Sequence, residues 1–278
     1  MARAFFPMTS PDLLFFYGLA LKMVMTATVV VITSVAVERS GPFAGALIGA
    51  LPTAAGAAYT ILALQHSPNF IAASAVGSVA VNAAVAGFAA TYAVLAQRNG
   101  LFISLGGPAL LWFAIVAALR TVEWTALGAV AINVVAFAIT IPVSWRYRAG
   151  GGPVKFIRRP FDIPLRALTA GIVVAVVTTA SSSIGSFASG MFALFPIILG
   201  SSIVIMHPRI GGKTTASMLA HAQLPLVGLA FGFLAVHYLV APLGVWLALV
   251  VGLVVCLLWS GALLMIRMRA TKRGEARA

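Results

Sequence analysis

Charged residues are almost absent from most of this chain, and their absence limits the possible folds more than any motif does. Only 8% of the 278 residues are charged, whereas 62% are hydrophobic. A soluble domain carries about 25% charged residues, because water must solvate its surface. The long apolar runs instead match the roughly 20 residues that a helix needs to cross a bilayer. The sequence therefore predicts an all-α polytopic membrane protein and excludes soluble enzymes and secreted disulfide scaffolds.

Apolar runs separated by proline, glycine and charge predict about nine transmembrane helices. They cover approximately residues 13–37, 42–65, 68–96, 100–120, 122–145, 163–184, 187–208, 214–241 and 243–267. Only four residues, from Arg120 to Glu123, separate the fourth run from the fifth. The sequence leaves open whether these two runs are separate helices.

The basic residues predict the orientation of the chain. The net charge is +13, and eleven of the 18 basic residues lie in two clusters, Arg146–Arg166 and Arg267–Arg277. Cytoplasmic segments of membrane proteins carry an excess of Lys and Arg, which contact anionic lipid headgroups. Both clusters are therefore expected in the cytoplasm, which places the C-terminus inside and the N-terminus outside. Because these charges flank apolar spans, we expect no nucleic acid partner.

A self-match at a shift of 144 residues predicts an internal duplication. The shift pairs Gly41, Phe43, Ala44, Pro52, Gly56 and Ile61 with Gly185, Phe187, Ala188, Pro196, Gly200 and Ile205, without a gap. After an insertion of three residues, 110–120 also aligns with 257–267. Each copy holds four spans and one extra span joins the copies, so the second copy is expected to be inverted in the membrane.

This duplication predicts the division of the chain. The predicted parts are a first four-helix repeat over 1–121, a connecting transmembrane helix over 122–145, a basic cytoplasmic linker over 146–162, a second four-helix repeat over 163–267 and a basic cytoplasmic tail over 268–278. Two inverted-topology repeats are typical of secondary transporters, whose sites lie near the midplane between the halves.

Short motifs in each repeat add a family resemblance. The first repeat has Lys22 early in its first helix, followed by Ala44-Gly45 and Pro52-Thr53 in its second. The second repeat keeps Phe195-Pro196 and has Arg166 in place of the lysine. Each repeat thereby resembles the small GlpM-like four-helix membrane proteins. The resemblance implies a bacterial inner-membrane protein with a role related to envelope polysaccharide, and it names neither a substrate nor catalytic residues.

The candidate substrate site lies at two prolines near the centres of their spans. Proline removes a backbone donor and opens a helix, and in lipid such a break needs surrounding protein or a polar cavity. The N–H groups that follow each break suit an anionic or carbonyl group. The predicted site residues are Pro52, Thr53, Gly56, Pro196, Gly200 and Ser201, with Lys22, Asn82, Asn133 and His221 as further lining.

Each of these residues also has a purely structural interpretation. A proline kink can serve packing alone, and Lys22 can extend its ammonium group to the membrane interface. Asn82 and Asn133 can hydrogen-bond between helices, and His221 can be a packing histidine. A polar cavity at the breaks would favour transport, whereas a tightly packed centre would favour a scaffold.

The sequence thus predicts a secondary transporter or facilitator for a small polar or anionic solute. The alternative is a non-transporting membrane scaffold or assembly factor for export of envelope polysaccharide or lipid. We expect no enzyme, cofactor or metal, because the five acidic residues form no buried pair and the four histidines lack metal-ligand spacing. The sequence specifies no oligomeric state, and a homodimer stays open.

Overall fold

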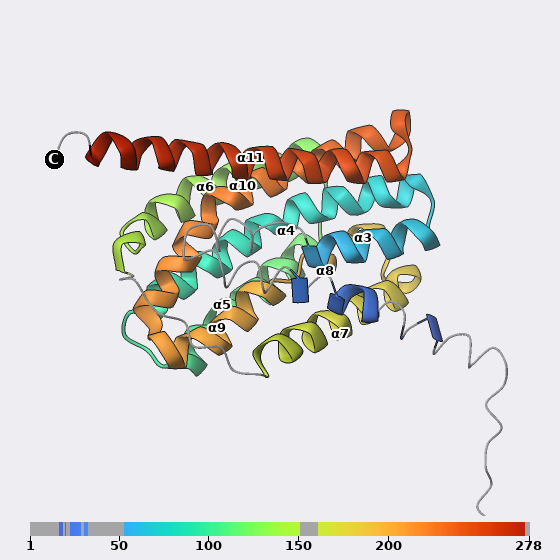
Figure 1. Cartoon of the computed structure of the whole chain (residues 1–278). Coiled ribbons are helices and arrows are strands. Elements are labelled where there is room, and N and C mark those ends of the chain that lie inside the picture. Colours follow the sequence, from blue (N-terminus) through green and yellow to red (C-terminus); the bar gives the residue numbers. More distant parts are fainter. Residues whose placement is uncertain are drawn as a thin grey trace, which may run out of the picture.

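The computed structural model describes residues 17–18, 20, 23–28, 31–32, 53–150 and 161–275, and its regular elements are helices (Figure 1). The elements are α3 (Thr53–Gln65), α4 (Pro68–Leu95), α5 (Leu101–Leu119), α6 (Ala126–Trp145), the short 3-10 helix η1 (Arg148–Gly150), α7 (Asp162–Ile184), α8 (Ser186–Ala193), α9 (Ile197–Ile210), α10 (Gly212–Leu243) and α11 (Val245–Glu275). Seven helical segments in these ranges are long and apolar enough to cross a bilayer, with α8 and α9 together forming one of them. The chain is therefore an all-α, multi-pass membrane protein.

The helix boundaries resolve the ambiguity between the fourth and fifth predicted spans. Helix α5 ends at Leu119 and α6 begins at Ala126, so these spans are separate helices. Helix α11 runs to Glu275 and so includes most of the tail that was predicted from residue 268. Because Arg, Lys and Glu are good helix formers, the helix continues after its apolar stretch ends. The count of nine helices stays a prediction.

Single glycines form three of the connections between helices. Gly185, Gly211 and Gly244 have φ angles of 82°, 83° and 78°, and each lies directly between two helices. A residue with a Cβ rarely adopts this left-handed region, whereas glycine enters it without a steric penalty. The chain can therefore reverse direction with almost no loop between α7 and α8, between α9 and α10, and between α10 and α11.

Helices α4 and α10 form the centre of the bundle and run antiparallel (Figure 1). The ring nitrogen Nδ1 of His237 lies 2.9 Å from the Ala72 carbonyl oxygen, near the start of α4 and toward the end of α10. Farther along α4, the Gln223 amide nitrogen donates to the Ala86 carbonyl at 3.0 Å. Later residues of α4 thus contact earlier residues of α10, as expected for an antiparallel pair.

Three helices begin 144 residues after three others. The pairs are α3 and α9 at Thr53 and Ile197, α4 and α10 at Pro68 and Gly212, and α5 and α11 at Leu101 and Val245. The spacing is that of the sequence self-match. Helix α6 lies between the two sets.

Helix α8 packs closely along α4 in a parallel direction. The Ser74 hydroxyl donates to the Ser186 carbonyl at 2.9 Å, and the Ser78 hydroxyl donates to the Gly190 carbonyl at 2.7 Å. A Cβ atom on Gly190 would overlap the backbone of Ser74, so only glycine permits this approach. Small residues at helix contacts are typical of membrane proteins, where close backbone packing replaces the hydrophobic effect.

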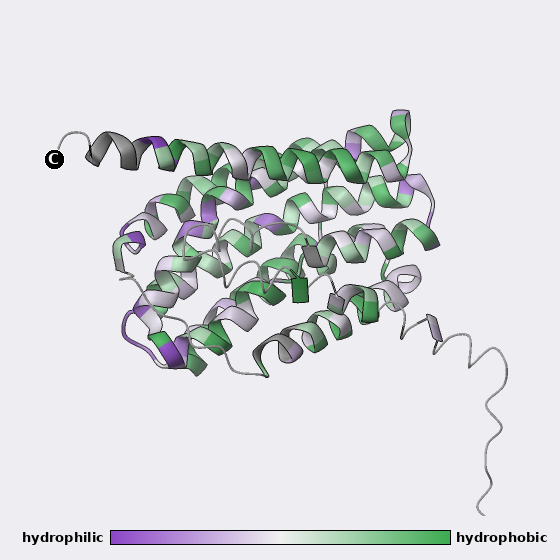
Figure 2. Ribbon diagram, viewed as in Figure 1, coloured by the Kyte–Doolittle hydropathy of each residue, from purple (hydrophilic) through white to green (hydrophobic). Residues whose placement is uncertain are grey.

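Charge and exposure divide the bundle into a lipid-facing side and polar ends (Figure 2). On α11, only 11% of the most apolar window is buried, whereas the corresponding share on α4 is 78%. Basic residues gather at one end of the bundle, which holds the end of α4, the α9–α10 turn, η1 and the last turns of α11. We call this the basic end. The α5–α6 connection, with Arg120 and Glu123, lies near His237 at the opposite end.

Candidate functional site

The predicted break at Pro196 separates two helices. Helix α8 ends at Ala193, and α9 begins at Ile197, directly after the buried Pro196. The backbone of Pro196 has φ −76° and ψ 56°, a ψ angle that is not helical. The break is packed by aromatic rings, because Phe195 lies edge-on to Trp112 of α5 with ring centroids 5.0 Å apart.

Two of the backbone N–H groups beside this break already have acceptors. The Ile197 N–H donates to the Phe195 carbonyl at 2.7 Å, and the Gly200 N–H donates to the Pro196 carbonyl at 2.8 Å. The Ser201 hydroxyl donates within its own helix to the Ile198 carbonyl at 3.2 Å. The start of α9 therefore offers a ligand fewer donors than the sequence predicted.

The corresponding site in the first half is described only from Thr53 onward. Pro52 and Lys22 lie outside the described residues. Thr53 begins α3, as Ile197 begins α9, and Gly56 lies one turn farther along. Gly56 lines a pocket, and among the predicted site residues that the structure describes it alone lines either of the two pockets considered below.

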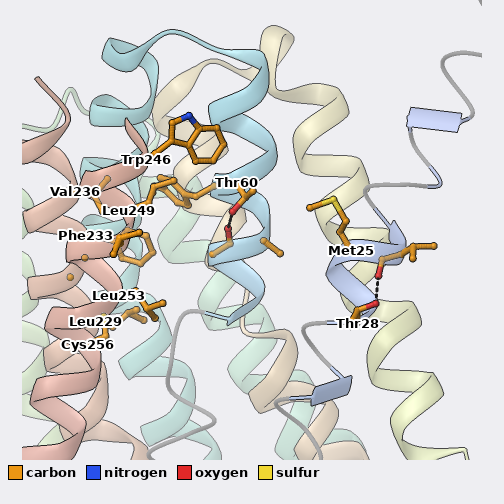
Figure 3. A pocket seen from close by; sticks show the side chains of 17 residues that line it. Met25, Thr28, Thr60, Leu229, Phe233, Val236, Trp246, Leu249, Leu253 and Cys256 are labelled. Atoms are coloured by element: carbon orange, nitrogen blue, oxygen red, sulfur yellow. Dashed lines mark hydrogen bonds between the residues drawn. The ribbon is translucent and has the colours of Figure 1, made fainter. Parts of the chain in front are cut away.

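That apolar pocket has a volume of about 650 Å³ and is partly open (Figure 3). It lies between α3, α10, α11 and the helical residues 23–28. The Thr60 hydroxyl donates to the Gly56 carbonyl of its own helix, and the Thr28 hydroxyl donates to the Val24 carbonyl. Because these hydroxyls are already paired and the other lining is mainly aliphatic and aromatic, the pocket suits an apolar group better than an anion.

A second, polar pocket of about 690 Å³ lies at the end of the bundle opposite the basic end. Arg120 and Glu123 from the α5–α6 connection line it together with Asn69 at the start of α4 and His237 of α10. His237 is oriented by its contact with the Ala72 carbonyl. The pocket thus combines a cationic and an anionic side chain with the polar side chains of Asn69, Thr125 and His237 at the outside of the bundle.

The central polar residues of the bundle form a hydrogen-bonded network. Asn82 of α4 donates through Nδ2 to Asn133 Oδ1 of α6 at 3.0 Å and to the Leu226 carbonyl of α10 at 2.9 Å. Asn133 donates to the carbonyls of Val79 and Ala129 at 2.6 and 2.8 Å. The two amides, 51 residues apart in sequence, thereby join three helices at one point.

A second group of hydrogen-bonded polar residues lies farther along α6, toward the basic end. The Thr140 hydroxyl donates to Gln223 Oε1 at 3.0 Å, and Gln223 in turn donates to the Ala86 carbonyl. Ser144, one turn farther along α6, is fully buried. We call this set the polar seam, and it consists of Asn82, Asn133, Thr140, Ser144 and Gln223.

Two atoms of the polar seam have no hydrogen-bond partner in the described part of the chain. They are the Asn82 side-chain oxygen Oδ1 and the Ser144 hydroxyl oxygen Oγ, and both are buried. A buried polar atom without a partner costs about 1–3 kcal/mol, so native proteins rarely keep one without a water, an ion or a ligand. The seam therefore has unused hydrogen-bonding capacity at the centre of the bundle.

The structure brings together only part of the predicted site. Asn82 and Asn133 meet in the polar seam, whereas Gly200 and Ser201 belong to α9. His221 lies nearer the basic end, where its ring nitrogen Nδ1 is 2.8 Å from the Ser217 carbonyl oxygen. The inter-helix hydrogen bonds of Asn82 and Asn133 directly support the alternative that these two residues serve helix packing.

Thr140 and Ser144 are not among the site residues predicted from the sequence. Their signal was present, because Asn133, Phe137, Thr140 and Ser144 follow the 4-3-4 spacing of one helix face. All four are buried. A search for polar residues that recur on one face of an apolar span would have found them.

No family model, curated protein or solved structure matches this chain. The fold and the site therefore define its class by themselves. The protein is an α-helical, multi-pass membrane protein whose central helices enclose a polar seam.

Proposed function

We propose that this protein is a secondary transporter or facilitator for a small polar or anionic solute, and that the solute passes the polar seam between two inverted repeats. The observation that carries the proposal is the contact of Asn82 with Leu226 in the centre of the seam. These residues lie 144 residues apart, which is the shift of the sequence self-match.

Three observations support the inverted arrangement. The sequence self-match and the three pairs of helix starts share one spacing, and the paired helices α4 and α10 run antiparallel. Equivalent residues of two copies related by a twofold axis meet only near that axis. Asn82 and Leu226 meet in this way, so the axis would pass through the middle of the seam. The resemblance of each repeat to GlpM-like proteins fits this arrangement.

The energetic cost of the polar seam supports a role beyond packing. Polar side chains inside a membrane are costly, and they commonly mark substrate or ion pathways. Helix association alone gives no reason to bury the Asn82 oxygen without a hydrogen-bond partner among the described residues. A solute O–H or N–H group can donate to that oxygen.

The mechanism would be a rocking movement of one repeat against the other about the α4–α10 contact. The polar pocket beside Arg120 and Glu123 would receive the solute at one end, and the basic end would be the other. The discontinuous helix α8–α9 can change the angle between its parts with little loss of backbone hydrogen bonds, because the break has already removed them.

The inverted arrangement predicts the topology of the chain. We expect a reporter at the C-terminus to be active in the cytoplasm and one at the N-terminus to be active outside. Paired reporters, one active only in each compartment, measure this on cells that express the full chain. Both ends on the same side of the membrane would disprove the nine-span inverted arrangement.

Transport itself is tested with two matched threonine variants. Thr140 and Thr178 are both buried in predicted spanning helices, but only Thr140 bonds across the seam, whereas Thr178 bonds to its own helix. In proteoliposomes we expect Thr140→Val to lower solute uptake at least about tenfold, equivalent to about 1.4 kcal/mol. Thr178→Val should stay within about twofold of the wild type.

The uptake assay uses a panel of radiolabelled small anions and neutral polar solutes against vesicles without protein. Pro196→Ala, which restores a backbone donor at the break, should also lower uptake. Equal uptake by both threonine variants would show that the polar seam is not part of the transport pathway. If no solute in the panel is taken up, the result would favour the second candidate function, which is described next.

The second candidate is a scaffold or assembly factor for envelope polysaccharide or lipid export. The observations that favour it are the aromatic packing at the Pro196 break and the apolar lining of the pocket between α3, α10 and α11. A scaffold would be inactive in proteoliposomes and would lose its cellular function when a lipid-facing partner surface is changed.

A further inference from the structure

The basic end contains an arginine that is held between helices instead of being directed into water. Arg148 belongs to η1, directly after α6, and its Nε donates to the Ala220 carbonyl of α10 at 3.3 Å. Its guanidinium group lies over the Trp145 ring, 4.1 Å from the ring centroid. The backbone carbonyl of Arg148 also accepts from the Ser217 hydroxyl at 2.7 Å. These contacts fix both the backbone and the side chain.

The held guanidinium group still has an unused donor. Its Nη2 nitrogen is buried and has no hydrogen-bond partner among the described residues. Arginine stays charged in proteins, so this nitrogen cannot reduce its cost by losing a proton. Native proteins rarely leave such a donor unmatched, so a water, an ion or a ligand group is expected beside it.

The neighbours of Arg148 increase its need for an anion. Burial lowers the pKa of Arg148, and the positive charge of Arg267 on α11 lowers it further. The positive charges of both arginines also act on His221 of α10. Like charges repel, and an anion bound between them would offset this repulsion. Arg148 and Arg267 come from two basic clusters that lie far apart in the sequence.

The depth of this cluster matches that of lipid headgroups. Trp145 is 60% exposed at the end of α6, and tryptophan at the end of a membrane helix is typical of the membrane–water interface. The arginine that stacks on it therefore lies beside the polar headgroups. Arginine presents a planar fork of N–H donors that matches the oxygens of a phosphate group.

We propose that Arg148, Arg267 and His221 form a binding site for a phosphate group at the basic end of the bundle. The phosphate of an anionic lipid is its expected source, because the site lies at headgroup depth. Arg148 would donate from Nη2, Arg267 would supply additional positive charge, and His221 would line the site. The site does not depend on the proposed transport function, because it uses none of the residues of the polar seam.

The test measures thermal unfolding of the purified full chain in detergent with added phosphatidylglycerol, with phosphatidylcholine or with sodium phosphate. We expect phosphatidylglycerol to raise the Tm of the wild type, and phosphatidylcholine, which has no net charge, to leave it nearly unchanged. Arg148→Gln should weaken the apparent affinity for phosphatidylglycerol at least tenfold. Arg269→Gln is the matched control, because it removes the same charge from an exposed position two residues after Arg267.

Arg267→Gln provides a second variant, at an exposed position of α11, and it should also weaken the response. A response of the wild type to sodium phosphate but not to phosphatidylglycerol would keep the phosphate site and overturn its lipid source. Equal losses in Arg148→Gln and Arg269→Gln would show attraction to general positive charge and overturn the site. No response of the wild type to either compound would also overturn it.

Discussion

Replacing Gly190 with alanine is expected to destabilise the protein by about 3 kcal/mol, the upper part of the usual range for overpacking. The added methyl group would overlap the Ser74 backbone on α4, and backbone atoms cannot move aside as a flexible side chain can. The helices would have to separate, which would also stretch the hydrogen bond from the Ser78 hydroxyl to the Gly190 carbonyl.

Gly106→Ala is the matched control for this prediction. Gly106 lies in α5, where an added methyl group would meet no atom within 4 Å. Alanine is the better helix former by about 0.5–1 kcal/mol, so this variant should unfold at the same temperature as the wild type or above it. Thermal unfolding of both variants in detergent gives the comparison. A Gly190→Ala protein as stable as Gly106→Ala would contradict the close packing of α4 and α8.

Replacing Asn133 with leucine is expected to cost about 2 kcal/mol of stability, because it removes three hydrogen bonds from the centre of the bundle. The Asn82 amide would keep only one acceptor, the Leu226 carbonyl, and would retain a buried donor without a partner. Removing one partner of a buried hydrogen bond costs more than removing both. The remaining polar group is still shielded from water but no longer forms the hydrogen bond that offsets this desolvation.

A double-mutant cycle separates this hydrogen-bond effect from a change of shape. The variants are Asn82→Leu, Asn133→Leu and the two together, each measured by unfolding in detergent. The double variant should be less destabilised than the sum of the single variants by about 1 kcal/mol, within the range measured for contacting residues and for inter-helix hydrogen bonds in membranes. Additive losses would show that the two amides do not interact.

Most of the helices could be predicted from the sequence because the membrane imposes a simple rule on them. An apolar run of about 20 residues must be helical, so α4, α6 and α10 were found within a few residues of their ends. The Pro196 break was also predictable, since proline cannot continue a helix without loss of a hydrogen bond. The helical end of α11 could not be predicted in this way, because hydropathy carries no signal for a helix once it has left the bilayer.

The arrangement of the polar groups could not be predicted in the same way. The sequence shows that Asn82, Asn133 and Gln223 lie in the middle of spans, but not toward which neighbour each side chain points. That direction depends on the rotation of each helix about its axis, and packing against other helices sets it. Arg148 was counted only as one of many cytoplasmic charges, because its burial depends on α10 and α11, which are distant in sequence.

The length of α11 has a practical consequence. Its 31 residues extend about 46 Å at 1.5 Å per residue, whereas the hydrocarbon layer is about 30 Å thick. If the helix stands close to the membrane normal, roughly the last three turns rise above the acyl chains as a stiff spacer. A fluorophore attached after Glu275 would therefore be held at a set height over the bilayer, and energy transfer to labelled lipids would report how far this helix tilts.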